Sequence, residues 1–117
     1  MEFYSVKKII SPETIELNNG LQIKLLGIKE KKDVNGKAKE FLQMKTKGQK
    51  VFIKSDEKKY DNENRLLAYV YLKNKTFLNA HLIKNGLAEV DTSYDFKYKN
   101  KFLKLLAQNG KKQKRHF

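Results

Sequence analysis

Hydrophobic residues alternate with polar ones, or form short apolar runs, in five short segments of the chain, and both patterns are typical of β-strands. The segments predicted to be strands are 6–10, 14–17, 21–25, 51–53 and 66–72. Asn19-Gly20 lies between the second and the third segment and is typical of a tight hairpin turn. Apolar residues fill nearly all of the fifth segment, which indicates that both of its faces are covered.

Apolar residues recur at helical spacing in other parts of the chain. Helices are expected at about 36–47, 77–83 and 96–107. Gly48 and Gly86 follow the first two, as glycine often does at the C-terminus of a helix. The polar segment 29–35 is expected to be a loop.

This order of elements predicts a mainly β protein of the α+β class. Five short strands, a helix after the third and further helices near the end suggest a small barrel with the OB-fold, a fold that often binds oligonucleotides. The domain is expected to span residues 1–110, and the basic segment 111–117 is expected to be a frayed tail.

Composition limits the class of protein further. The chain has 117 residues, of which 39% are hydrophobic, enough for one domain with one modest core. The absence of cysteine excludes a disulfide scaffold, a thiol nucleophile and a cysteine-ligated metal. No apolar run approaches the roughly 18 residues of a membrane span, and the first residues lead directly into strand-like sequence rather than a signal peptide. We therefore expect a cytoplasmic protein, or a domain of a larger one, with no membrane partner.

The net charge of +13 is concentrated in two stretches. Residues 29–50 carry eight lysines and three acids, and residues 97–117 carry eight basic residues and no acid. The remaining segments, 1–28 and 51–96, are neutral. Lysine provides 24 of the 26 basic residues, so a bias in composition is an alternative source of the charge. Positive charge localised in this way favours a polyanion as partner.

Four motifs in a fixed order point to a known family. They are Leu-Leu-Gly-Ile at 25–28, Gly-Lys-Ala-Lys-Glu-Phe-Leu at 36–42, Asp-Asn-Glu-Asn-Arg-Leu-Leu-Ala-Tyr-Val at 61–70, and Leu-Asn followed by Gly-Leu-Ala within 78–88. Over about residues 6–108 the chain resembles the staphylococcal nuclease-like (thermonuclease) family. Active members are calcium-dependent phosphodiesterases of DNA and RNA, in which carboxylates hold the ion, a glutamate activates water and two arginines stabilise the phosphoryl group.

The resemblance implies a role for five positions of this chain. Glu13 stands where the family has a metal-binding aspartate, Lys24 stands for the first arginine, and Arg65 matches the second. In an ungapped alignment, Lys29 replaces the second metal carboxylate and Lys32 replaces the general base. Lysine repels a divalent cation, and its protonated side chain cannot accept a proton at neutral pH.

We therefore expect a staphylococcal nuclease-like domain whose calcium and catalytic site is degraded. It is expected to bind single-stranded DNA or RNA, or duplex DNA, with little sequence preference and without a cofactor. The side chains expected to contact phosphate are Lys24, Lys29, Lys31, Lys32 and Arg65.

Two alternatives remain open. A one-residue slip in the segment 29–35 would bring Glu30 and Asp33 to the vacated positions, so that Glu13, Glu30 and Asp33 would hold Ca²⁺ in an active nuclease. In that case Arg65, Glu13 and Glu30 would be the catalytic residues. Alternatively, the barrel is a protein-interaction scaffold whose lysines face an acidic partner.

Two groups of side chains also have a structural reading. Arg65 can form an ion pair with Asp61 or Glu63 instead of binding phosphate. Four aromatic residues near the expected cleft can stack on bases or pack against the barrel; they are Tyr60, Tyr94, Phe96 and Tyr98.

Overall fold

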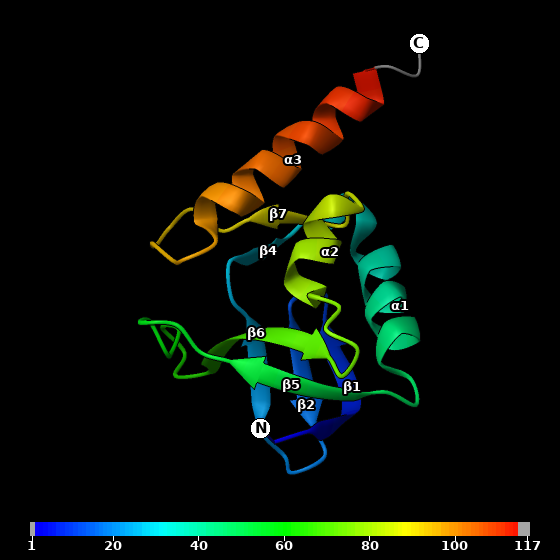
Figure 1. Ribbon diagram of the computed structural model, residues 1–117, viewed down its shortest axis with the longest axis vertical. Coiled ribbons are helices and arrows are strands. Elements are labelled where there is room, and N and C mark those ends of the chain that lie inside the picture. Colours follow the sequence, from blue (N-terminus) through cyan, green and yellow to red (C-terminus); the bar gives the residue numbers. More distant parts are fainter. Residues whose placement is uncertain (1, 115–117) are drawn as a thin grey trace.

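Five strands close into a barrel in the computed structural model, which describes the backbone of residues 2–114 and the side chains of residues 2–109 (Figure 1). The strand order around the barrel is β1-β2-β3-β6-β5, and only β3 and β6 are parallel neighbours. The strands are β1 (Tyr4–Ser11), β2 (Thr14–Leu17), β3 (Gln22–Leu25), β5 (Lys50–Lys54) and β6 (Leu66–Leu72). The predicted five-stranded barrel is therefore confirmed.

Three helices and a second small sheet pack beside and beyond the barrel, with α3 at the far end of the molecule (Figure 1). The helices are α1 (Asn35–Thr46), α2 (Leu78–Lys84) and α3 (Lys99–Lys114). The small sheet pairs β4 (Ile28–Glu30) with β7 (Ala88–Val90) in antiparallel fashion. No helix among residues 2–114 combines the length and the apolar character needed to cross a bilayer.

The prediction of a loop at 29–35 was wrong. Lys29 and Glu30 belong to β4, and Lys32–Val34 form a 3₁₀ turn that leads into α1. A strand of three residues with one buried side chain is too short to show a period of two. The strand forms by pairing with β7, which lies about sixty residues later in the chain and brings Glu89 opposite Lys29.

The last helix also differs from its expected limits. It begins at Lys99 and continues through Gly110 to Lys114, so residues 111–114 of the predicted tail are helical. Glycine inside a helix costs only about 1 kcal/mol relative to alanine, and the polar residues that follow are compatible with a helix. Residues 115–117 of the predicted tail lie outside the described residues.

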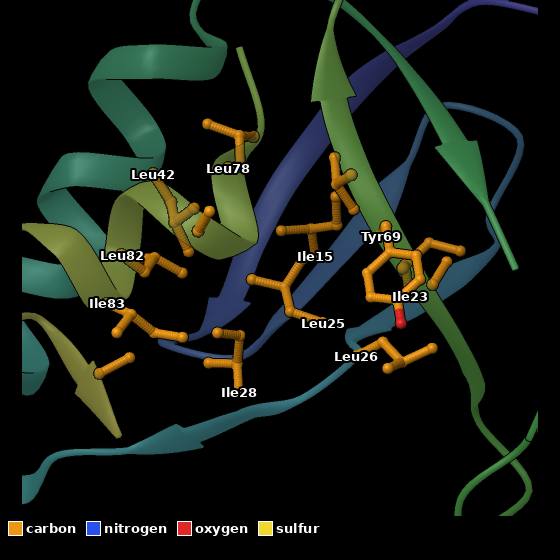
Figure 2. Packing of buried hydrophobic residues seen from close by; sticks show 14 of the residues in the cluster. Ile15, Ile23, Leu25, Leu26, Ile28, Leu42, Tyr69, Leu78, Leu82 and Ile83 are labelled. Carbon is orange, nitrogen blue, oxygen red and sulfur yellow. The ribbon is translucent and has the colours of Figure 1, made fainter. Parts of the chain in front are cut away.

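One continuous core joins the barrel to the helices (Figure 2). Ile15, Ile23 and Leu25 fill the barrel, and Leu42 and Leu82 extend the same cluster into α1 and α2.

Buried Asn79 on α2 connects this core to the backbone around it. Its amide Nδ2 donates to the carbonyl oxygen of Leu26 at 2.9 Å, and its Oδ1 accepts from the N–H of Val70 at 2.9 Å. These bonds hold α2 against β6 and fix the position of the chain between β3 and β4.

Candidate functional site

The centre of the candidate site is an ion pair between Glu13 and Lys24. Glu13 lies in the turn before β2, and Lys24 lies on β3 opposite Thr14. The Lys24 ammonium is 3.3 Å from Glu13 Oε1 and donates to the carbonyl oxygen of Ile28 at 3.1 Å. The Lys24 side chain is only 10% exposed. A buried ammonium needs such partners, because an unpaired charge in the interior is strongly unfavourable.

This geometry differs from the expected one for Lys24. Lys24 is among the side chains expected to contact phosphate. In the structure, its two contacts are protein oxygens, and the residue is buried. Lys24 therefore acts first as an internal cation that joins the β1–β2 turn to the start of β4.

The second oxygen of Glu13 is used as well. Glu13 Oε2 accepts a hydrogen bond from the backbone N–H of Glu30 at 3.0 Å. This bond attaches β4 to the β1–β2 turn. Both carboxylate oxygens of Glu13 thus have partners within the protein, one cationic and one a backbone donor.

These contacts do not suit a calcium ion. Ca²⁺ takes six to eight oxygen ligands with carboxylates among them, whereas here an ammonium already lies against the Glu13 carboxylate. The structure does not gather Glu13, Glu30 and Asp33 into one cluster: within the described part of the chain, no three acidic or histidine side chains are placed to hold a metal. Asp33 lies exposed on the 3₁₀ turn.

The lysines that follow Lys24 in the predicted set are more accessible. Lys29 on β4 and Lys32 on the 3₁₀ turn are exposed, and Lys31 between them is partly buried. They flank Glu30 in the sequence. Because the Glu30 N–H donates to Glu13, these lysines belong to the segment that contacts the Glu13–Lys24 pair.

Arg65 is held by carboxylates of its own turn. Its Nε donates to Asp61 Oδ2 at 2.8 Å, and its Nη2 lies 3.5 Å from Glu63 Oε2. The backbone N–H groups of Arg65 and Glu63 donate to Asp61 Oδ1. Burial acts to raise the pKa of the Asp61 carboxyl, but the hydrogen bonds from Arg65 and Glu63 outweigh it and lower that pKa. The ion pair between Arg65 and Asp61 is therefore present in the structure. The Arg65 side chain nevertheless remains 30% exposed.

Tyr94 lies near carboxylates of both groups of charges. Its hydroxyl accepts a hydrogen bond from the N–H of Gly27 at 2.8 Å. Burial raises the pKa of Tyr94 to about 12; the Gly27 bond acts in the opposite direction, and the carboxylates of Asp91, Asp61 and Glu13 add to the rise. Tyr94 also borders a hollow of about 230 Å³ next to the Asp61 turn.

Gly27 determines the direction in which the chain leaves β3. Its φ is +79°, and a Cβ added there would lie 2.6 Å from the ring of Phe96. The sequence predicts Tyr94 and Phe96 near the cleft but does not predict these contacts. No local pattern could reveal them, because the partners are almost seventy residues apart.

The other aromatic residues proposed for the cleft have different environments. Phe96 is buried against the core, Tyr98 is partly buried, and Tyr60 is 54% exposed. Of the four, Tyr60 is the most accessible to a base.

Comparison with known proteins agrees with the fold and with the motifs. The sequence model of the family described as staphylococcal nuclease homologue matches residues 5–117, nearly the whole chain. A search of curated proteins found no match. The barrel, its three helices and the order of the motifs are those expected of this family, and the chain belongs to the staphylococcal nuclease homologue family.

Proposed function

We propose that this protein binds the phosphate backbone of nucleic acid, with little sequence preference, and that the hydrolytic centre of its family is degraded in it. Membership of the family supports a nucleic-acid-binding or nuclease-like function in general. The proposal narrows this to binding without hydrolysis.

The Glu13–Lys24 ion pair is the observation that carries the proposal. The Lys24 ammonium lies 3.3 Å from Glu13 Oε1, so it competes directly with any metal cation for the oxygens of the Glu13 carboxylate. A divalent metal would have to displace a buried positive charge or accept one as its neighbour, and both are unfavourable. Without a metal and a carboxylate base, the large rate factors of phosphodiester hydrolysis are lost.

Exposed basic side chains near this pair support binding. Lys29 and Lys32 present their ammonium groups to solvent, and Lys31 lies between them. Arg65 is paired through Nε with Asp61 but has five N–H donors in total, so its outer nitrogens can still donate to a phosphate oxygen.

One experiment separates binding from hydrolysis. The purified protein is incubated with an end-labelled single-stranded oligonucleotide, with Ca²⁺ in one sample and with a chelator in the other. The products are run on a denaturing gel and the complexes on a native gel. We expect a shifted complex and uncut oligonucleotide in both samples.

Cleavage that needs Ca²⁺ would contradict the proposal. If Glu30→Gln or Asp33→Asn then abolished cleavage, the active-nuclease alternative would replace it. The absence of any complex, with or without the metal, would favour the protein-interaction scaffold.

A further inference from the structure

A layer of aromatic rings covers the outer face of β5 and β6. Phe52 and Tyr71 are direct partners across the two strands, and their rings are parallel with centroids 5.0 Å apart. Phe3 packs edge-on against Phe52 at 5.9 Å. Val51 and Val70, the strand neighbours of these rings, are fully buried in the barrel core. The rings therefore lie on the opposite, outer side of the sheet.

A hollow of about 370 Å³ opens over these rings. Three aromatic residues and three lysines border it, namely Phe3, Phe52, Tyr71, Lys54, Lys73 and Lys75. All three lysines are exposed, and Phe3 is 42% exposed. The hollow contains no acidic residue, and it shares no residue with the Glu13–Lys24 pair or with the hollow beside Tyr94.

Two of the lysines lie over ring faces. The Lys73 ammonium is 5.4 Å from the centre of the Phe3 ring, and that of Lys54 is 5.5 Å from the centre of the Tyr71 ring. Among the described residues, no ion pair joins Lys54, Lys73 or Lys75 to a carboxylate. Cation–π contacts at exposed sites are weak, so these ammonium groups can turn toward an incoming anion.

The backbone at Lys75 is an independent indication. Lys75 has a φ of +73°, a left-handed conformation that glycine or asparagine adopts more readily. Its N–H closes the turn by donating to the carbonyl oxygen of Leu72 at 2.8 Å. A lysine here adds a positive charge at the edge of the hollow despite an unfavourable backbone conformation.

We propose that this hollow binds a base of single-stranded nucleic acid, which stacks on the exposed ring of Phe3 while the three lysines contact the adjacent phosphates. The inference rests on the proposed function and adds a second contact surface to it. Stacking on aromatic side chains combined with a basic rim is how proteins hold single strands without reading sequence. Bases within a duplex are paired and stacked on each other, so they cannot enter the hollow.

The test measures binding of a labelled 12-nucleotide single strand and of a duplex of the same length by fluorescence anisotropy. Phe3→Ala is expected to weaken binding of the single strand about fivefold or more, the size of one lost stacking contact. Binding of the duplex is expected to change less than twofold. Thermal unfolding of the variant shows whether it remains folded.

A second variant does not depend on the stability of the first. Lys75→Asn removes a charge and also suits the left-handed backbone, so the melting temperature is expected to stay the same or rise. The salt dependence of single-strand binding is expected to fall by about 0.7 in slope, the value for one phosphate contact. The matched control is Lys84→Asn, which removes an exposed lysine of α2 away from the hollow and is expected to leave the slope unchanged.

The outcomes separate the two proposals. If the unmodified protein binds single strands and Phe3→Ala and Lys75→Asn bind them equally well, the hollow is not a binding site, and the proposed function stands. If the unmodified protein binds neither nucleic acid, both proposals are overturned. If an acidic peptide competes as well as the single strand and Phe3→Ala has no effect, the hollow is only a basic patch, and this inference is wrong.

Discussion

Lys24 shows how one side chain can change the chemistry of a site. Its ammonium binds Glu13 and the Ile28 carbonyl, so it neutralises a carboxylate and joins β3 to β4. We expect Lys24→Ala to destabilise the fold by about 1–3 kcal/mol, because it leaves a partly buried carboxylate and a carbonyl without their donor. Glu13 is 21% exposed, so water recovers part of the loss. Urea unfolding at neutral pH measures the change.

A double variant provides the control for Lys24. Glu13→Gln with Lys24→Met removes both charges while keeping side chains of similar size. It is expected to be more stable than Lys24→Ala, because no buried charge remains unpaired. If Lys24→Ala unfolded at the same urea concentration as the unmodified protein, the ion pair would not contribute to the stability of the fold.

Gly27 is a second position where one residue controls the site. Gly27→Ala places a Cβ 2.6 Å from the Phe96 ring and forces an L-residue to a φ of +79°. We expect a loss of about 2 kcal/mol or more, since backbone strain and a steric clash add. Gly20→Ala is the matched control: its φ is +87°, but a Cβ there meets nothing within 4 Å. It is expected to lose only about 1 kcal/mol, and equal losses in the two variants would show that the Phe96 contact is unimportant.

The residues of the candidate site were predictable to different degrees. The pairing of Arg65 with Asp61 could be foreseen, because the two residues lie four positions apart in one turn. The burial of Lys24 could not be foreseen, because the sequence shows only a polar residue between two apolar residues of a strand. Its environment depends on the return of the chain at Ile28, and that return depends on contacts with residues 90–96.

Among the elements, the connection between β5 and β6 is fixed by a carboxylate. Asp56 accepts hydrogen bonds from the hydroxyl of Tyr69 and from the backbone N–H groups of Lys97 and Glu57. Burial acts to raise the pKa of the Asp56 carboxyl, but these bonds outweigh it and hold the pKa below its ordinary value. The segment after β5 is thereby tied to the loop before α3.

This arrangement predicts how stability depends on pH. A carboxyl whose pKa is lowered by folding stabilises the protein above its unfolded pKa of about 4, and this contribution is lost as the pH falls through the lower, folded value. Asp56→Asn is therefore expected to lower the free energy of unfolding by about 1–3 kcal/mol at pH 7 and by less at pH 3. Urea titrations at the two pH values measure the difference. Glu57→Gln, which removes an exposed carboxylate of the same segment, is the control, and an equal loss for Asp56→Asn at both pH values would contradict the prediction.

The elements themselves were predicted best where the pattern is long. The strand at 66–72 and the helices α1 and α2 were predicted within one residue of their observed limits. The strand β4 was not predicted, because three residues cannot show a period and its partner β7 is distant in sequence. The C-terminal end of α3 lies beyond the predicted limit at residue 107, because the polar residues 108–114 show no apolar periodicity that would predict a helix.

At the scale of the whole molecule, the excess positive charge follows the arrangement of the elements. The basic stretch 29–50 covers β4, the 3₁₀ turn and α1, and the stretch from residue 97 onward covers α3. Figure 1 shows β4 and α3 beyond the barrel and α1 along one side of it, while strands of the neutral segments form most of the barrel. The charge is therefore uneven across the molecule, and a polyanion is attracted toward one side of it.

This uneven charge predicts the dependence of binding on salt. If about five phosphates of duplex DNA are neutralised, the logarithm of the affinity falls with the logarithm of salt concentration at a slope of about −4 to −5. Between about 50 and 200 mM salt the affinity then falls roughly 250- to 1000-fold.

Lys32→Gln is expected to reduce the slope by about 0.9 because it removes one phosphate contact. Lys8→Gln removes an exposed lysine of β1, in a neutral segment of the barrel, and is expected to leave the slope unchanged. Anisotropy titrations at several salt concentrations measure all three slopes. An affinity that did not change over this range would mean that lysine–phosphate contacts do not hold the complex together, and equal slopes for the two variants would mean that the contacts are not localised beside Glu13 and Lys24.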